Sequence, residues 1–142
     1  MPGNECGALI KKINTIQEHR VNQNLSEMNL TLSQWRYLDY MYSRGGRGIL
    51  MKDFEEYFNV SQPTVAGIVK RLAAKDLIYL EKFQEDPHYK TANLTEKGER
   101  VYRESSKRKK SIDDVLLGPL DSEEKAEFQR LLIKVYDGNR EA

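Results

Sequence analysis

Features that would indicate an extracellular, metal-binding or membrane protein are scarce in this chain of 142 residues. The single cysteine, Cys6, excludes an intrachain disulfide and is typical of a reducing cytoplasm, where we expect the protein to act. The two histidines, His19 and His88, lie far apart and neither has a partner at metal-ligand spacing, so we expect no metal. No apolar run approaches the roughly 20 residues of a membrane span, and the N-terminus lacks the apolar core of a signal peptide.

Nucleophilic catalysis has equally little support. A Cys6–His19 pair is formally available, but nothing around it supplies an orienting group or oxyanion donors. We therefore expect neither an enzyme nor a cofactor. Two interpretations of Cys6 stay open: a peroxide-sensing thiol, and a free cysteine near a frayed terminus. No basic residue precedes Lys11 to activate the thiol, which favours the second.

The chain is also nearly neutral. It has 23 Lys and Arg against 22 Asp and Glu, a formal net charge of +1, and 39% hydrophobic residues. This composition describes one domain, with helical extensions, that is long enough to bury a core. Because there is no overall attraction to nucleic acid, any such binding must come from a local basic surface.

Residues 60–76 have the pattern of a helix that presents such a surface. Ser61 is a residue type that caps the free N–H groups of a first turn, and Pro63 lacks a donor that this turn cannot use. Apolar residues follow at helical spacing and predict one buried stripe: Val65, Ile68, Val69 and Leu72. The opposite face has no acidic residue before Asp76 and carries Gln62, Thr64, Lys70, Arg71 and Lys75.

Such a helix has two interpretations. It is typical of a major-groove reader, in which short polar groups reach base edges and Lys or Arg meet phosphate. It is also typical of a half-buried helix with a solvated basic face. The neighbouring segments have to decide between the two.

Those segments complete a winged helix-turn-helix. Residues 49–51 predict a short strand, residues 52–58 a short helix, and residues 59–60 a tight turn into the longer helix. Residues 77–83 are rich in β-branched and aromatic residues and predict a strand, and residues 90–94 predict a second strand that returns after a polar turn. A hairpin in this position is a wing, which can lay its loop into the neighbouring minor groove.

Four further helices are predicted, three of them with a cap at Thr31, Thr95 or Asp121. They cover residues 5–24, 31–43, 95–117 and the segment after residue 121. In the second of them we expect a buried side made of Trp35, Leu38, Met41 and Tyr42.

The other three helices lie outside the winged module, whose small core does not need them. Their apolar stripes include Leu9, Ile13, Ile16, Leu131, Leu132 and Val135. We expect these stripes to pack against a second copy of the chain, since twofold homodimers are the commonest oligomers. The alternative is that the helices pack only on their own domain.

Several short motifs occur in a specific order: residues 30–31 with 34–35, residues 60–65 leading to 70–72, residues 75–78, and residues 94–98. Each is weak alone, but their order and spacing resemble the MarR family of bacterial winged helix-turn-helix transcriptional regulators over nearly the whole chain. The resemblance implies a homodimer, an operator with inverted half-sites, and regulation that a small molecule or an oxidant relieves.

Some positions depart from the family pattern, beginning with Asp76, where the family usually has Gly. At the wing tip the family has Asp-Arg-Arg, with the second Arg in the minor groove, whereas this chain ends the same pattern with His88. A histidine is only partly charged near neutral pH, so we expect a weaker contact, or one supplied by Lys90. Ala66 and Gly67 stand where polar or basic residues are common, which leaves more of the recognition to DNA shape.

Two other groups of residues have competing interpretations. The four consecutive cations at residues 107–110 point in all directions on a helix, so we interpret them as solvated surface rather than as an anion site. A second set forms a candidate effector cavity between the terminal helices and the winged module, the alternative being core packing: His19, Arg20, Trp35 and Tyr42.

The sequence thus predicts a mostly α protein of the α+β class. A winged helix-turn-helix at residues 31–95 would lie between dimerisation helices in residues 1–30 and 96–142. We expect a homodimeric, cytoplasmic regulator of transcription that binds double-stranded DNA, most simply a repressor, with a small aromatic or anionic effector. The alternative is a winged-helix module that uses the same face on a protein partner.

The residues expected to contact DNA divide by role. Gln62 and Thr64 read base edges, and Ser61 caps the helix and touches phosphate. The full set is Ser61, Gln62, Thr64, Gly67, Lys70, Arg71, His88 and Lys90, of which Lys70 and Arg71 meet the backbone and the last two serve the wing.

Overall fold

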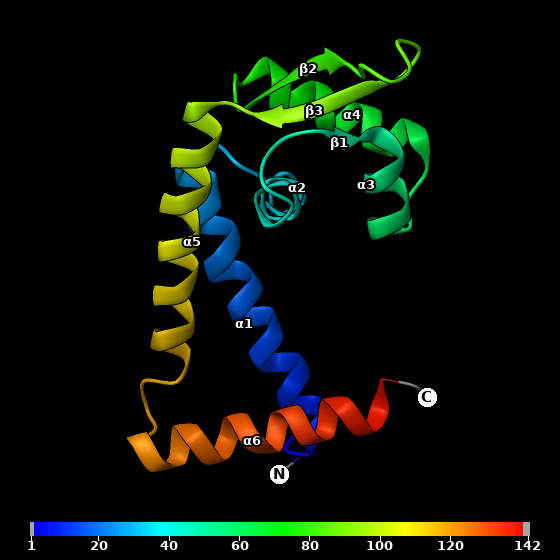
Figure 1. The fold of residues 1–142 in the computed structure, drawn as a ribbon. Helices are drawn as coiled ribbons and strands as arrows, with labels where there is room; N and C mark the ends of the chain where they lie inside the picture. The colour runs from blue at the N-terminus through cyan, green and yellow to red at the C-terminus, as the bar shows by residue number, and fades with distance from the viewer. Residues whose placement is uncertain (1, 141–142) are drawn as a thin grey trace.

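The computed structural model describes residues 2–140. Figure 1 shows a winged module above a stem of long helices. In chain order the elements are α1 (Cys6–Glu27), α2 (Leu32–Ser43), β1 (Ile49–Leu50), α3 (Met51–Phe58), α4 (Gln62–Ala74), β2 (Ile78–Lys82), β3 (Lys90–Leu94), α5 (Glu96–Leu116) and α6 (Ser122–Asn139). The expected mostly α class with a small sheet is confirmed. Within this part of the chain, no helix is both long and apolar enough to cross a membrane.

The sheet is antiparallel, with β3 in the centre between β1 and β2. Ala92 of β3 lies opposite Ile49 on one side and Leu80 on the other. Asn93 fixes the loop that leads into β1, because its side-chain oxygen accepts a hydrogen bond from the Gly48 N–H at 2.9 Å. The predicted hairpin is therefore confirmed, and its loop projects beyond the sheet in Figure 1.

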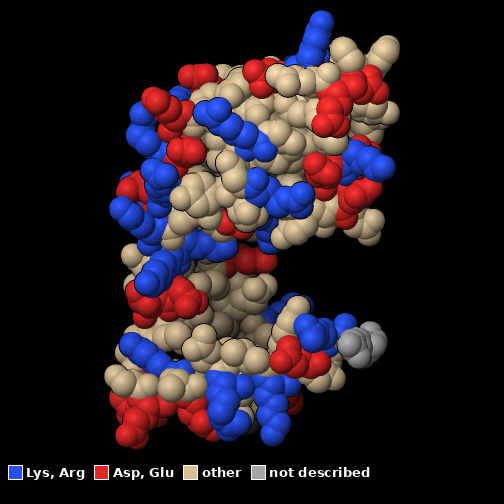
Figure 2. All heavy atoms as spheres, in the orientation of Figure 1, with Lys and Arg blue, Asp and Glu red and all other residues tan. Residues whose placement is uncertain are grey.

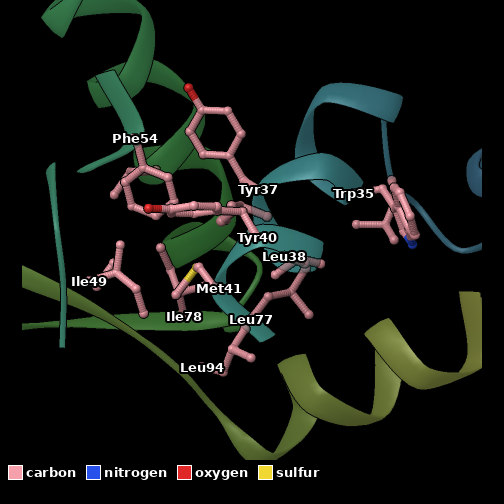
Figure 3. Close-up of a cluster of buried hydrophobic side chains, with 14 of the residues drawn as sticks. Trp35, Tyr37, Leu38, Tyr40, Met41, Ile49, Phe54, Leu77, Ile78 and Leu94 are labelled. Atoms are coloured by element: carbon pink, nitrogen blue, oxygen red, sulfur yellow. The ribbon is translucent and has the colours of Figure 1, made fainter. Parts of the chain in front are cut away.

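The core of the module is built around α2, which neighbouring elements surround. Figure 3 shows Leu38 and Met41 of this helix packed towards the sheet, and both are fully buried. Tyr37 stacks on Phe54, with ring centroids 4.9 Å apart and ring planes 9° from parallel. The expected buried side of α2 was wrong at Tyr42, which is 39% exposed. Because the helix is enclosed on more than one side, its burial exceeds a single stripe.

Several element boundaries differ from the prediction by one to three residues, and two of these differences have a clear cause. The first helix continues to Glu27 and ends there because Asn29 takes a left-handed conformation with φ of 57°. Met51 belongs to α3 rather than to the strand before it. The Asp53 carboxylate accepts a hydrogen bond from the Leu50 N–H at 2.9 Å, which makes Leu50 the residue that precedes the first turn.

The caps predicted for the two C-terminal helices are confirmed. The Thr95 hydroxyl oxygen accepts a hydrogen bond from the Gly98 N–H at 2.9 Å and donates one to the Asp76 carbonyl at 2.7 Å. Asp121 and Glu124 form a reciprocal capping box at the start of α6. The start of α5 is thus tied to the segment that follows α4.

Gly98 makes this junction possible, and its replacement is the first prediction. A Cβ atom at this position would lie 2.0 Å from the carbonyl oxygen of Leu77. We expect Gly98→Ala to lower the free energy of unfolding by about 1–3 kcal/mol or more, as overpacking against backbone does. Urea denaturation followed by circular dichroism measures the change.

Gly7→Ala is the matched control, because a Cβ atom there meets nothing within 4 Å. This helical glycine should gain about 0.5–1 kcal/mol of stability on the same substitution. Equal stability of the Gly98→Ala variant and the native protein would contradict the close approach of α5 to Leu77.

Candidate nucleic-acid interface

The reading helix α4 starts from a compact turn. Asn59 ends α3 in a left-handed conformation with φ of 52°, and the Val60 N–H donates to the Glu55 carbonyl at 3.2 Å. The chain thereby reverses within three residues, and α4 begins at Gln62. Its buried side is Val65, Val69 and Leu72, so the predicted polar and basic face points away from the core.

Ser61 stands at the predicted capping position, but its expected hydrogen bond is absent. The residue is the N-cap of α4 by backbone conformation, yet its side chain caps no N–H group. Its hydroxyl instead lies 3.0 Å from the Thr64 hydroxyl. Both side chains are exposed, and they face solvent at the start of the helix.

The structure places the other predicted α4 contacts on two flanks. Gln62 faces the wing and lines a hollow together with Lys52, Glu85, His88 and Lys90. Thr64 and Arg71 lie on the opposite flank, in a groove between α4 and the start of α2. The groove is also lined by Pro63, Gly67 and Ile68 of α4 and by Thr31, Ser33 and Gln34 at the start of α2. Ala66 and Lys70 are exposed and line neither hollow.

The cations of this surface differ in whether other groups of the chain bind them. Within residues 2–140, Lys70 and Arg71 make no ion pair, so both charges are available to a partner. Lys75, expected on the same outer face, is instead a structural residue. Its ammonium donates to the Asn29 carbonyl at 2.5 Å and to the Gln34 side-chain oxygen at 2.7 Å, and burial lowers its pKa. The helical pattern alone gave no sign of these two acceptors.

The wing carries both signs of charge. His88 at the tip is 93% exposed, and its Nδ1 atom lies 2.9 Å from the Asp86 carboxylate, which also accepts the His88 backbone N–H at 3.1 Å. At the wing root, which is the last strand pair before the wing loop, Lys82 and Lys90 lie directly opposite each other, and both are exposed. Like charges in this position repel, so a bound anion would relieve the repulsion. The sequence analysis missed Lys82, whose role follows from the strand register.

A second hollow lies where α1, α2 and α5 meet. It is lined by Gln17, Trp35, Asp39, Tyr102, Ser106, Lys109, Lys110 and Asp113. The Lys109 ammonium stands 3.9 Å above the centre of the Trp35 ring, and the Tyr102 hydroxyl donates to Asp39 at 2.6 Å. Burial lowers the pKa of Lys109, and it is the largest cause of the raised pKa of Tyr102.

Three buried polar atoms in the walls of this hollow lack a partner. The Trp35 ring N–H, the Gln17 side-chain oxygen and the Ser106 hydroxyl form no hydrogen bond with any group of the described chain. Buried polar groups are normally paired, because an unpaired one costs about 1–3 kcal/mol. The walls of the hollow therefore contain unsatisfied donors and acceptors.

The predicted effector residues are not brought together as one set. Trp35 lines this hollow, whereas Arg20 lines a separate one between α1 and α5. Tyr42 stacks on Tyr102 with ring centroids 4.6 Å apart, and His19 is exposed. These four residues come from different faces of α1 and α2, which sequence position alone does not separate.

We expected the basic run at residues 107–110 to be solvated, but two of its side chains contact other helices. Lys109 covers Trp35, and Arg108 lies 3.3 Å from Glu27 of α1 and 3.4 Å from Glu104. The helix does point its four cations in different directions, but two of these directions face other helices.

Comparisons with known sequences find one family model and two related regulators. A family model described as the MarR family matches residues 28–86. YwoH, an uncharacterised HTH-type transcriptional regulator of Bacillus subtilis (strain 168), is 29% identical over 112 residues, which cover 79% of this chain and 80% of YwoH. YybA, a second such regulator of this organism, is 27% identical over 133 residues, which cover 92% of this chain and 83% of YybA.

Solved structures show the same fold. MepR, described as a transcription regulator of the Staphylococcus aureus multidrug efflux pump MepA, matches with a TM-score of 0.85 at 22% identity, over 94% of this chain and 98% of MepR. The structure of MepR bound to DNA matches with a TM-score of 0.71 at 22% identity, over 97% of this chain and 99% of MepR. The winged module and the helical stem therefore recur together in other proteins.

The second prediction compares two helix starts. Because the Ser61 side chain caps no N–H group, Ser61→Ala should change the free energy of unfolding by less than about 0.5 kcal/mol. Thr95→Ala removes a real cap and should cost about 1–2 kcal/mol. Urea denaturation of both variants gives the comparison. An equal loss in the two variants would mean that Ser61 caps α4 in solution.

Proposed function

We propose that this chain is a DNA-binding transcriptional regulator of the MarR family, whose model matches residues 28–86. In this proposal a homodimer binds an operator with inverted half-sites, most simply as a repressor, and a small ligand releases it. The observation that carries the proposal is the outer surface of α4, which has no acidic residue and two cations without an ion-pair partner, Lys70 and Arg71. A phosphate backbone is the partner that such a surface fits.

The predicted contacts keep their roles in this proposal. Gln62 reads base edges beside the wing, and Thr64 reads them beside α2, while Lys70 and Arg71 meet phosphate. At the wing, the root pair of Lys82 and Lys90 supplies the phosphate contact. His88 contributes less, because the Asp86 carboxylate at 2.9 Å offsets any charge on the ring.

We propose a homodimer because the apolar side chains of α6 are not covered within one chain. None of its residues is buried, although it begins with a well-formed capping box. Its apolar side chains are 37–66% exposed: Phe128, Leu131, Leu132, Ile133, Val135 and Tyr136. The start of α1 is similar, with Leu9, Ile10, Ile13 and Ile16 at 39–52%. Soluble monomers rarely tolerate so large an apolar surface, which a second copy of these helices would cover.

Figure 1 shows how this surface is arranged. Helix α6 crosses below the ends of α1 and α5, away from the winged module. Figure 2 shows the open hollow that separates this lower layer from the module. We propose that residues 1–30 and 96–142 form the dimerisation region, and that residues 31–95 form the DNA-binding module. A twofold axis through the stem would then set two reading helices in successive major grooves, with half-sites about 10 bp apart.

The hollow lined by Trp35 and Lys109 is the proposed effector site. Its unpaired Trp35 N–H, its indole face and the Lys109 ammonium suit a small aromatic anion. Such a ligand would satisfy the donor and attract the ammonium. The site lies between the stem and α2, which is part of the winged module. A ligand bound there would therefore change how the module is positioned relative to the stem.

The third prediction separates base reading from phosphate contact. Gln62→Ala should cost roughly 1–3 kcal/mol on the preferred operator and much less on unrelated DNA, because it removes one base-edge contact per half-site. Lys70→Ala should weaken all sequences about equally and lower the salt dependence by roughly one counterion per protomer. Fluorescence anisotropy at several salt concentrations measures both effects.

These measurements also decide between DNA and a protein partner. Equal losses on specific and unrelated DNA for both variants would show that α4 grips phosphate without reading bases. Absence of a steep salt dependence on any DNA would favour a winged-helix module that binds protein.

The fourth prediction concerns the dimer. Sedimentation equilibrium at micromolar concentration should give twice the chain mass of 16.5 kDa. Leu132→Asp should raise the dissociation constant at least about tenfold, because it places a charge on the apolar side of α6. Lys134→Asp, the same residue introduced on the opposite side of the helix, is the control and should leave the dimer intact. A native protein that sediments as a 16.5 kDa monomer would overturn the proposal.

The fifth prediction tests the effector site with benzoate as the probe. Trp35 is the only tryptophan, so a ligand in the hollow should change the intrinsic fluorescence in a saturable way. Benzoate should also weaken operator binding by the native protein. Lys109→Met should reduce benzoate affinity about tenfold, whereas Lys107→Met, an exposed neighbour outside the hollow, should not. Unchanged fluorescence at millimolar benzoate would show that the hollow does not take this class of anion.

A further inference from the structure

We infer that the reading helix recognises its half-site through thymine methyl groups, which pack against a bare ridge formed by Pro63, Ala66 and Gly67. The inference rests on the proposed DNA-binding function and specifies what that surface reads. At these three positions the exposed side of α4 has no polar side chain, and this limits what the helix can contact on DNA.

The ridge lies on the side of α4 opposite the core. Val65, Val69 and Leu72 fix the buried side. At 3.6 residues per turn, Pro63 and Gly67 lie one turn apart on the outer side, with Ala66 next to them. Pro63 and Ala66 are exposed, and Gly67 is half-buried. The ridge is thus the part of the first two turns that faces outward.

Longer polar side chains lie around this ridge, and Pro63 and Gly67 form part of the groove wall that faces α2. Gln62 stands on the wing side and Thr64 on the α2 side. Lys70 follows one turn further along the helix, and Arg71 folds back so that its guanidinium lies 3.9 Å from where a Cβ atom of Gly67 would be. The polar groups therefore reach the edges of a groove while the ridge faces its floor.

The ridge residues cannot read a base edge by side-chain hydrogen bonds. Proline also lacks a backbone N–H, and the other two residues have no polar side-chain atom. The one apolar feature in the DNA major groove is the C5-methyl group of thymine, and alanine methyl groups are suited to contact it. A ridge without long side chains also lets the helix backbone come closer to the base pairs.

The expected half-site therefore has A·T pairs under the ridge. Gln62 at the edge of the ridge agrees with this, because glutamine pairs bidentately with adenine. A ridge read by hydrogen bonds would instead require polar side chains at residues 66 and 67, where this chain has alanine and glycine.

The test starts from an operator selected by the full-length protein from a random DNA library. Each thymine of one half-site is then replaced by deoxyuridine, which deletes the methyl group and keeps every hydrogen-bonding group. We expect one or two positions to lose about 3–5-fold in affinity, the value of one buried methyl group. The other thymines should stay within twofold.

Two matched variants assign the methyl contact to the ridge. Ala66→Gly removes the methyl group of the ridge, and Ala74→Gly makes the same change in the last turn of α4, outside the ridge. The deoxyuridine penalty at one position should disappear with Ala66→Gly and persist with Ala74→Gly. Each penalty is a ratio of two affinities measured with the same variant, so a loss of helix propensity in that variant cancels.

The outcomes separate the inference from the function on which it rests. If an operator is enriched and bound, but no deoxyuridine changes the affinity, the ridge does not read methyl groups and only the inference fails. A penalty that persists equally in both variants would also overturn it. If no sequence is enriched, the proposed function fails together with the inference.

Discussion

The structure depends on one tight junction, where the start of α5 meets the end of the reading helix. Gly98 approaches the Leu77 carbonyl so closely that no side chain fits between them. Next to it, the Thr95 hydroxyl caps α5 and donates to the Asp76 carbonyl. Because α5 packs against both α2 and β3 of the module, this junction fixes the orientation of α4 relative to the stem. In the proposed dimer, the same junction sets the spacing of the two reading helices.

Helix α2 gives the proposed effector site a short physical connection to α4. Two consecutive residues of this helix face different partners. The Gln34 side chain accepts the Lys75 ammonium at the end of α4, and Trp35 lines the hollow under Lys109. A ligand that moves the indole therefore acts on the helix that also holds the end of α4. For this to change DNA affinity, the ligand must bind the DNA-bound and free arrangements differently, since a ligand with equal affinity for both shifts nothing.

Sequence analysis predicted the features that depend on neighbouring residues. The caps at Thr95 and Asp121, the hairpin and the buried stripe of α4 all follow from residue types within a few positions. It was wrong where a contact comes from a distant segment. Lys75 looked like a surface cation because its acceptors lie on α2 and the preceding loop, and Lys109 looked solvated because the indole beneath it is on another helix. The same limit explains Lys82, because strand register determines that Lys90 lies across from it.

The nearly neutral charge of the chain has a consequence for how the proposed regulator selects its site. Non-specific affinity for DNA grows with the number of phosphates that the protein neutralises. On the proposed interface, the cations without an ion pair within residues 2–140 are Lys70, Arg71 and the pair at the wing root, while the wing tip carries Asp86 next to His88. We expect such a surface to bind unrelated DNA weakly, so that the ratio of specific to non-specific affinity depends on base contacts and DNA shape rather than on charge. In a genome with many competing sites, that ratio determines which sites are occupied.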